Sequence, residues 1–446
     1  MNQDFTEGNI RGALVRFALP MMAGNLLQQL YNVADTLIVG QVLGKEALAA
    51  VGASYTLMTF LTSILIGLCM GSGVEFSLCF GKKDMEGMKN GVFMSFVLIG
   101  GVTAGLTLLS FGGIDLILKF MQVPGDTYGL MREYLWVIFW GITASFLYNF
   151  FAAWLRSIGN SAIPLIFLGI SAVMNIGLDL YFVIGLGWGV GGAALATVMS
   201  QYAAGIGICV YTLLRFPKMR LKKRHFRWRK AVLREIFQLS FLTCIQQSVM
   251  NFGILMVQGL VNSFGTVVMA AFSAAVKIDS FAYMPVQDFG NAFSTFVAQN
   301  HGAGKQERIR DGIRNAVQLT FIFCLIISLL VWIFARQLML LFVKPWETEI
   351  LSVGVSYLRI EGSFYCLIGF LFLFYGFYRA VKRPGMSVVL TVLSLGSRVL
   401  LAYTLSAVPG IGVNGIWAAV PLGWMLADAV GYIYLRRRFL ACSAGR

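Results

Sequence analysis

The chain has 446 residues, of which 58% are hydrophobic and only 12% are charged. A soluble globular protein typically has about 25% charged residues, so this composition excludes a surface that faces mainly water. The formal net charge of +15 would suggest nucleic-acid binding if the basic residues formed one patch, but they fall into alternate loops. We therefore expect an integral membrane protein with no nucleic-acid partner.

Apolar segments long enough to cross a hydrocarbon core of about 30 Å recur along the whole chain. Each must be helical in lipid, because an unpaired backbone group there costs several kcal/mol, and none shows the strict alternation of barrel strands. The fold class that we predict is an all-α polytopic membrane protein. In chain order the twelve expected transmembrane helices are 13–40, 47–80, 90–121, 129–157, 163–185, 190–215, 234–263, 267–300, 311–342, 351–380, 386–407 and 413–436.

The distribution of Lys and Arg predicts the orientation of these helices. Of the 35 basic residues, 27 lie on the side of the N-terminus, five on the opposite side and three at membrane depth. By the positive-inside rule the first side is cytoplasmic, so both termini are expected in the cytoplasm of a bacterial inner membrane. Ten of the 27 lie between Arg215 and Arg234, a segment that either binds anionic lipid headgroups or serves only as a topology signal and linker.

The two halves of the chain resemble each other. Gly44 matches Gly265 at a shift of 221 positions, and Arg156 matches Arg379 at a shift of 223. Such a steady shift indicates a duplication. We predict two six-helix lobes, 1–215 and 234–446, joined by a flexible basic cytoplasmic linker, 216–233. Because six spans return the chain to the same side, the lobes are expected to be related by a pseudo-two-fold axis along the membrane normal, with the substrate between them.

Two acids lie within predicted spans of the first half. An ionised group in lipid costs on the order of 3 kcal/mol or more, so such acids are usually functional. Asp35 lies in the first span, and Asn175 and Asp179 share one face of the fifth, with Thr197 in the sixth. Two carboxylates with amide and hydroxyl oxygens can hold Na⁺ or share a proton. The alternative is a hydrogen-bond network that only joins helices.

The acidic pair has no counterpart in the second half. Asp35 aligns with Met256, Asp179 with Ala402, and Asn175 with the cation Arg398. We therefore expect the two halves to have different functions, with ion coupling in the first half.

The second half has its own polar residues at membrane depth, which either neutralise one another or contact substrate. Arg398 requires a partner there, and we expect Glu361, Asp288 or Asp428. The candidates for this C-lobe charge network or substrate site are Gln246, Lys277, Asp279, Asp288, Glu361 and Arg398.

Proline and glycine suggest where helices bend and pack. Pro20 lies in the same span as Asp35, so a hinge at Pro20 could link the ion state to the shape of that helix. Gly101-x-x-x-Gly105 permits close helix packing.

Several motifs together resemble the multidrug and toxic compound extrusion (MATE) family, nearest its DinF-like branch. They are Leu19-Pro20, Asn32 to Gly40, Ala49 to Gly52, Asn175 to Asp179, Gly185 to Thr197 and Ala298 to Gly304.

The resemblance implies a V-shaped pair of lobes that export small organic, often cationic, molecules in exchange for H⁺ or Na⁺. It also implies that Asp35, Asn175, Asp179 and Thr197 bind the coupling cation, with no other cofactor. The NorM-like branch places acids in helices 7 and 10, whereas this chain has Gln246 and Gln247 in the seventh span and Glu361 in the tenth.

The sequence leaves two other functions to consider. A lipid-linked oligosaccharide flippase of the same wider superfamily would need several basic residues for a diphosphate, and only Lys277, Arg359 and Arg398 are candidates. A membrane enzyme would need a nucleophile motif, clustered catalytic acids or a metal cluster, and the sequence has none of these. We expect a transporter that is not an enzyme and that acts as a monomer.

Overall fold

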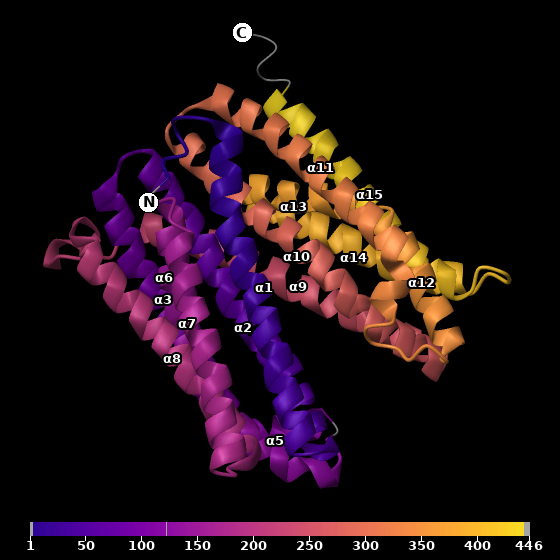
Figure 1. The fold of residues 1–446 in the computed structure, drawn as a ribbon. Coiled ribbons are helices and arrows are strands. Elements are labelled where there is room, and N and C mark those ends of the chain that lie inside the picture. Colours follow the sequence, from indigo (N-terminus) through magenta and orange to yellow (C-terminus); the bar gives the residue numbers. More distant parts are fainter. Residues whose placement is uncertain (1–2, 122, 441–446) are drawn as a thin grey trace. The chain divides into compact units, whose positions relative to one another are not determined.

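The structure is a computed structural model that describes residues 3–121 and 123–440, and within these ranges it contains helices and no strand (Figure 1). The α-helices are α1 (Ile10–Val42), α2 (Lys45–Gly81), α3 (Met85–Gly112), α4 (Ile114–Phe120), α5 (Gly125–Ile138), α6 (Gly141–Ser157), α7 (Ala162–Asp179), α8 (Gly189–Arg215), α9 (Lys230–Asn262), α10 (Thr266–Gly302), α11 (Gln306–Met339), α12 (Thr348–Gly362), α13 (Tyr365–Ala380), α14 (Pro384–Ser406) and α15 (Val413–Leu435). Short π or 3₁₀ segments are η1 (Leu180–Gly185), η2 (Pro217–Met219), η3 (Lys223–His225) and η4 (Arg436–Leu440).

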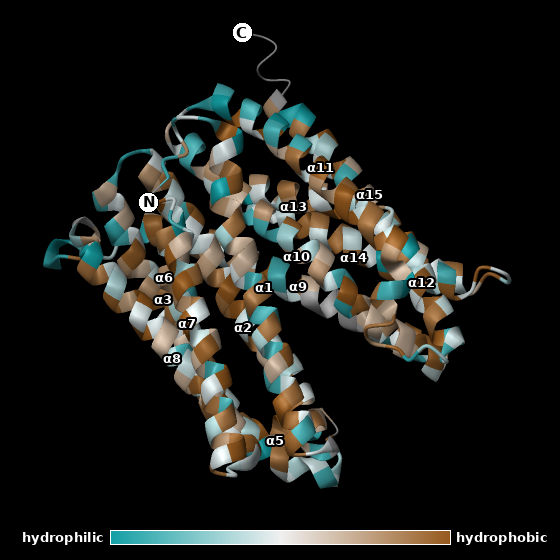
Figure 2. Ribbon diagram, in the orientation of Figure 1, coloured by the Kyte–Doolittle hydropathy of each residue, from teal (hydrophilic) through white to brown (hydrophobic). Residues whose placement is uncertain are grey.

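The predicted all-helical membrane fold is confirmed. Among the described residues, eight helices are long and apolar enough to cross a membrane, and the number is ten if each of the bent pairs α5–α6 and α12–α13 forms one span. The 33-residue helices α1 and α9 correspond to the predicted first and seventh spans. In Figure 2 hydrophilic residues gather mainly at helix ends and in loops. Large apolar side chains such as Leu325, Leu329 and Ile333 are exposed along α11, as expected for a surface that faces lipid.

Three of the predicted spans are not single straight helices. The span 90–121 breaks at Gly113, between α3 and α4, since consecutive glycines are poor helix formers. The spans 129–157 and 351–380 bend by 43° and 51°, between α5 and α6 and between α12 and α13. A glycine flanks each of these two bends, Gly141 in the first half and Gly362 in the second.

The backbone shows the duplication independently of residue identity. All ten described positions after α1 that adopt a positive φ fall into five pairs, at a shift of 221 or 223 positions. A left-handed backbone position is rare for residues other than Gly. Its occurrence at equivalent positions of the repeat therefore indicates that the backbone follows the same path in both halves. The pairs are Gly44 and Gly265, Lys83 and Gly304, Gly159 and Lys382, Gly187 and Gly410, and Gly189 and Gly412.

The chain packs into two compact units, which we call unit 1 and unit 2. Unit 1 contains the described residues of Met1–Thr6 together with Arg16–Cys244 and Gly302–Gly304. Unit 2 contains Glu7–Val15, Ile245–His301 and the described part of Lys305–Arg446. The chain therefore passes from one unit to the other within α1 and again within α9. The lobe limits at 1–215 and 234–446 stay a prediction.

The start of α1 is attached to α11 in unit 2 by side-chain hydrogen bonds. Arg11 Nε donates to Asn315 Oδ1 at 2.6 Å, and Arg11 Nη2 donates to Gln318. Arg308 Nη2 donates to the carbonyl oxygens of Glu7 and Gly8 at 2.7 and 2.9 Å.

The basic segment 216–233 lies in unit 1 and is folded onto it. It contains η2 and η3, and the side chains of Met219 and His225 are buried. These two side chains attach the segment to unit 1, and its role as a flexible linker between the lobes stays a prediction.

The first half of α9 packs against α2 in unit 1 through two glycines that the sequence analysis did not select. A Cβ atom on Gly67 would lie 2.5 Å from Cα of Cys244, and one on Gly71 would lie 2.5 Å from Cα of Ser240. Ser72 and Ser240 hydrogen-bond beside this contact, at 2.9 Å. The proposed close packing at Gly101 and Gly105 is wrong within the described residues, where an added Cβ meets nothing within 4 Å.

The contact between α2 and α9 predicts a stability difference between two glycine substitutions. Gly71→Val should destabilise the protein by about 1–3 kcal/mol or more, because the added side chain meets the α9 backbone. Gly101→Val places the same side chain in open space and should leave stability nearly unchanged. Thermal unfolding followed by tryptophan fluorescence in detergent measures both. Equal unfolding temperatures for the two variants would contradict the assigned contact.

Candidate functional site

The four residues proposed as a cation site come from three helices of unit 1. Asp35 lies on α1, Asn175 and Asp179 lie on α7, and Thr197 lies on α8. Asp179 is the last residue of α7, and the π-helical segment η1 begins at the next residue. In unit 2, α14 continues as a regular α-helix to Ser406 through most of the equivalent positions. A local π-helical turn often marks a functional site, and here it follows the acid that only the first half contains.

The structure brings these residues together. Asp179 is 0% exposed and Asn175 is 1% exposed, while Asp35 and Thr197 are half-buried. Asn175 Nδ2 donates to Thr197 Oγ1 at 3.3 Å, and the Thr197 hydroxyl donates to the carbonyl oxygen of Ala193 at 3.2 Å. Thr197 thereby fixes the orientation of the Asn175 amide and leaves its oxygen free to face the acids.

Four buried oxygen atoms of this cluster have no hydrogen-bond donor within the described part of the chain. They are Asp35 Oδ1, Asn175 Oδ1 and both carboxylate oxygens of Asp179. The carboxyl groups of Asp35 and Asp179 face each other, so a proton on either one would join them. Each unsatisfied buried acceptor costs about 1–3 kcal/mol, and more when it is charged. A proton or an alkali cation is the kind of ligand that removes this cost.

Tyr134 on α5 is a member of the site that sequence reasoning missed. Its side chain is buried, and its phenol lies within electrostatic range of both Asp35 and Asp179. The internal repeat was the sequence signal that could have identified Tyr134, because the dipeptide Tyr134-Leu135 recurs as Tyr357-Leu358 at the equivalent position of the second half. Gln201, one turn after Thr197, instead accepts a hydrogen bond from Ser145 at 3.4 Å.

Unit 2 contains a second buried cluster that includes a cation. Asp279 on α10 and Glu361 on α12 are buried, and Arg398 on α14 lies within electrostatic range of both. The phenols of Tyr365 and Tyr357 lie beside Asp279 and Glu361. Of the three acids expected near Arg398, Glu361 is found there, and Asp279 joins it.

The other candidate residues of the second half are distributed differently. Gln246 on α9 and Asp288 on α10 are buried, whereas Lys277 is exposed although Asp279, two residues later, is buried. Asp428 on α15 lies near Tyr375. Lys277 is therefore not a partner of the buried cluster.

Arg359 was the third basic residue expected at membrane depth. Its guanidinium lies 4.9 Å above the ring of Trp332, in a cation–π contact.

No group of three or more His, Cys, Asp or Glu side chains within the described residues is arranged to hold a metal ion. The unit 1 cluster differs from such a site because it combines only two carboxylates with an amide and a hydroxyl. This donor set suits a proton or a weakly bound alkali ion rather than a resident transition metal.

Comparisons with known proteins identify relatives along the full length of the chain. The family model MatE matches residues 20–182 and 240–404, one match in each half. The "Probable multidrug resistance protein YpnP" of Bacillus subtilis is 30% identical over 97% of this chain and 96% of its own length. The "Probable multidrug resistance protein NorM" of Thermotoga maritima is 26% identical over 94% of this chain and 90% of its own.

Solved structures share the fold. One is the outward-facing conformation of a multidrug resistance MATE family transporter of the MOP superfamily, with a TM-score of 0.92, 26% identity and coverage of 99% of this chain and 98% of that one. Another is a MOP superfamily transporter from Pyrococcus furiosus, for which reverse polarity of the binding pocket suggests a different function. Its TM-score is 0.92, at 26% identity and 98% coverage of both chains.

The unsatisfied oxygens of unit 1 predict that a neutral side chain at position 179 stabilises the fold. In sodium-free buffer at high pH, Asp179→Asn should raise the free energy of unfolding by about 1–3 kcal/mol, because it removes a buried like charge and supplies amide donors. Wild type should gain stability when acid or Na⁺ is added, and the variant should not. Thermal unfolding over a pH and sodium series measures this.

The matched control is Asp311→Asn, which removes the same charge from an exposed position on α11. It should keep the wild-type response to acid or Na⁺. A lower unfolding temperature for Asp179→Asn, with an unchanged cation response, would contradict the proposed role of the oxygens.

Proposed function

The chain belongs to the MatE family of multidrug efflux transporters, and we propose that it is a secondary active antiporter. It exports small organic, often cationic, compounds in exchange for H⁺ or Na⁺ by alternating access. The single observation that supports the coupling mechanism is the set of four donor-free oxygens of Asp35, Asn175 and Asp179, buried in an apolar unit.

The proposed coupling rests on neutralisation of the acidic pair. With no cation bound, two facing carboxyl groups repel each other when both are ionised, and low dielectric strengthens the repulsion. A proton bridges Asp35 and Asp179, whereas Na⁺ would be held by the same carboxylates with the oxygens of Asn175 and Thr197. Because α1, α5, α7 and α8 each contribute a residue or neighbour to the cluster, binding changes how these helices pack.

The coupling cation binds in unit 1 only, because unit 2 contains a fixed positive charge. Arg398 occupies the position equivalent to Asn175 and lies near Asp279 and Glu361. A tethered guanidinium neutralises acids permanently and cannot be exchanged during a transport cycle. Gln246, Asp288 and the exposed Lys277 are the candidates of unit 2 for contact with the transported compound.

We place the protein in a bacterial inner membrane with both termini in the cytoplasm. The concentration of Lys and Arg in alternate loops supports this orientation. The proposed assembly is a monomer.

A lipid-linked oligosaccharide flippase is the alternative function, and the basic residues favour it less. Arg398 lies beside two acids, and the Arg359 guanidinium lies over Trp332. A diphosphate would therefore meet two buried acids beside Arg398, and at Arg359 it would compete with the ring of Trp332. Drug susceptibility of cells that overexpress the protein distinguishes the two functions.

Transport of a fluorescent organic cation into inside-out vesicles tests the proposed function. Under a pH or sodium gradient, Asp35→Asn and Asp179→Asn should each reduce gradient-driven uptake by about tenfold or more, equivalent to about 1.4 kcal/mol of coupling free energy. Asp311→Asn should transport at the wild-type rate. Undiminished uptake by both site variants would end the proposal that the acidic pair couples transport.

Pro20 is proposed as the hinge that links the acidic pair to helix shape. It lies inside α1, five residues after Val15, where the chain leaves unit 2 for unit 1. A proline removes one backbone hydrogen bond and lets a helix bend. Pro20→Ala should therefore lower uptake severalfold in the same vesicle assay while leaving the cation response of thermal stability intact.

Pro421→Ala, which removes a proline from α15 in unit 2, is the matched control and should have a smaller effect on uptake. Wild-type transport and wild-type ion dependence in Pro20→Ala would refute the hinge.

A further inference from the structure

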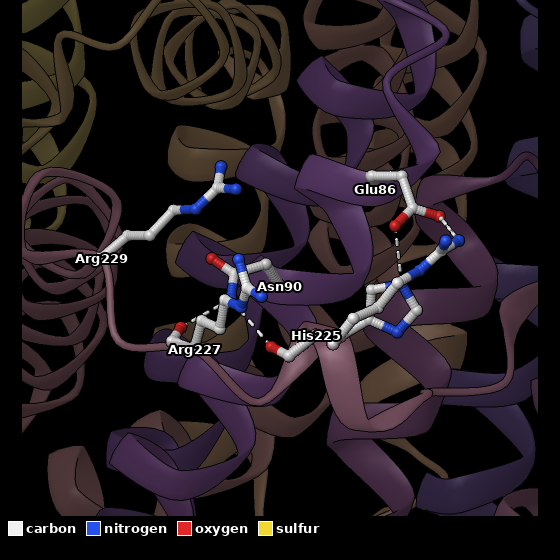
Figure 3. Close-up of a pocket in the computed structure, with 6 residues that line it drawn as sticks. Glu86, Asn90, His225, Arg227 and Arg229 are labelled. Atoms are coloured by element: carbon white, nitrogen blue, oxygen red, sulfur yellow. Dashed lines mark hydrogen bonds and ion pairs between the residues drawn. The ribbon is translucent and has the colours of Figure 1, made fainter.

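The basic segment that joins the two halves forms a small polar pocket against the start of α3. The pocket has a volume of about 220 Å³ and is lined by Glu86, Asn90, Arg224, His225, Arg227 and Arg229 (Figure 3). It is smaller than the roughly 300–1,000 Å³ of pockets that hold drug-sized ligands, so its size suits a headgroup rather than a transported drug. All six residues belong to unit 1.

The one acid of the pocket is already neutralised by its neighbours. Glu86 Oε1 accepts a hydrogen bond from Arg224 Nη2 at 2.7 Å, and Glu86 Oε2 lies 2.8 Å from His225 Nε2. His225 Nδ1 accepts the backbone N–H of Lys222 at 2.7 Å, so Nε2 is the nitrogen that donates to Glu86. Lys89 Nζ lies 3.7 Å from the same carboxylate. Glu86 therefore anchors the segment and contributes little net negative charge to the pocket.

Arg227 and Arg229 remain available to an anion. Both are exposed, and no carboxylate within the described residues lies within the 4.0 Å of an ion pair with either one. In Figure 3, Glu86 and His225 lie at one end of the pocket and Arg229 at the other, with Asn90 and Arg227 between them. A planar guanidinium binds phosphate oxygens in pairs, so two arginines that line one pocket without a carboxylate partner suit a phosphate.

Asn90 fixes the pocket and adds a second recognition element. Its Nδ2 donates to the carbonyl oxygens of His225 and Arg227 at 2.9 and 2.7 Å, which holds the segment on α3. Asn90 is 4% exposed, and its Oδ1 has no hydrogen-bond donor within the described part of the chain. A buried acceptor beside two arginines favours a ligand that brings a hydroxyl group as well as a phosphate.

Two aromatic side chains next to the pocket point to a ligand at the membrane surface. Phe226 and Trp228 pack edge-to-face on Phe93 of α3, with ring centroids 4.8 and 5.9 Å apart. They are nevertheless 49% and 61% exposed. Aromatic residues that alternate with arginines are typical of the membrane–water interface, where rings meet acyl chains and cations meet phosphates.

We propose that this pocket binds the headgroup of a hydroxyl-bearing anionic glycerophospholipid, of the phosphatidylglycerol type, from the cytoplasmic leaflet. Arg227 and Arg229 bind the phosphodiester, Asn90 Oδ1 accepts a headgroup hydroxyl, and Phe226 and Trp228 contact the acyl chains. The site is independent of the antiport chemistry and rests only on the orientation proposed above. It would attach the segment between the halves to the membrane surface as well as to α3.

Native mass spectrometry of the full chain in detergent tests the site. Wild type should retain phosphatidylglycerol in preference to phosphatidylethanolamine. Arg227→Gln/Arg229→Gln should weaken retention roughly 30-fold, since each basic residue near an anionic headgroup contributes about 1 kcal/mol and about 1.4 kcal/mol is a tenfold change. Arg437→Gln/Arg438→Gln, with the same charge change near the C-terminus, should retain the lipid like wild type.

Other outcomes would overturn the proposal. These are equal retention by the pocket variant and wild type, equal loss in both double variants, and no preference over phosphatidylethanolamine. Displacement of the lipid by soluble glycerol phosphate at equal phosphate concentration would show a site for free anions, and would likewise overturn it. Thermal unfolding of each variant confirms that the exposed substitutions leave the fold intact.

Discussion

The main electrostatic constraint in the cation site of unit 1 is a set of buried acceptor oxygens without hydrogen-bond donors. Asp35, Asn175 and Asp179 hold four such atoms among apolar helices, where water cannot compensate them. The arrangement is costly unless a positive charge enters, and no side chain of the cluster supplies one. Thr197 and Tyr134 orient or neighbour the acids without neutralising them. This arrangement is the basis of our proposal that the unit takes up an external cation and releases it during transport.

Unit 2 differs because its buried acids lie within electrostatic range of a cation that belongs to the chain, Arg398. Its acids stand where unit 1 has apolar residues, since Asp279 corresponds to Met58 and Glu361 to Ile138 at the shifts of the repeat. Arg398 lies within electrostatic range of both, although Asp279 Oδ1, Glu361 Oε1 and Arg398 Nε also lack a hydrogen-bond partner within the described residues. The backbone path, the bent helix pairs and the Tyr134 and Tyr357 positions are common to both units, whereas the charges are not. Helix packing depends mainly on shape, and buried charges can therefore change in one copy of a duplicated fold without altering its path.

The connection between the halves is anchored rather than free. Asn90 holds the backbone of the basic segment, and Gly67 and Gly71 allow the first half of α9 to pack closely on α2. Two of the changes of unit occur inside helices, α1 and α9, and none occurs in the basic segment 216–233. Helices transmit displacement more directly than loops because their backbone hydrogen bonds resist local bending. Pro20, inside α1, is the position where that resistance is reduced.

The sequence by itself determined the membrane class, the all-helical fold, the approximate limits of most helices, and the duplication. These depend on hydropathy, length and register, which are properties of consecutive residues. The pair Asn175 and Asp179 was also accessible, because residues four apart on a helix share a face.

Only the tertiary structure decided which residues from distant helices meet. Helix–helix contacts are set by side-chain packing across many turns, which no local pattern specifies. The sequence therefore selected Gly101 and Gly105 for close packing, whereas the structure uses Gly67 and Gly71. It likewise did not predict Tyr134 beside the acids, Asp279 beside Arg398, or the folding of the basic segment onto α3.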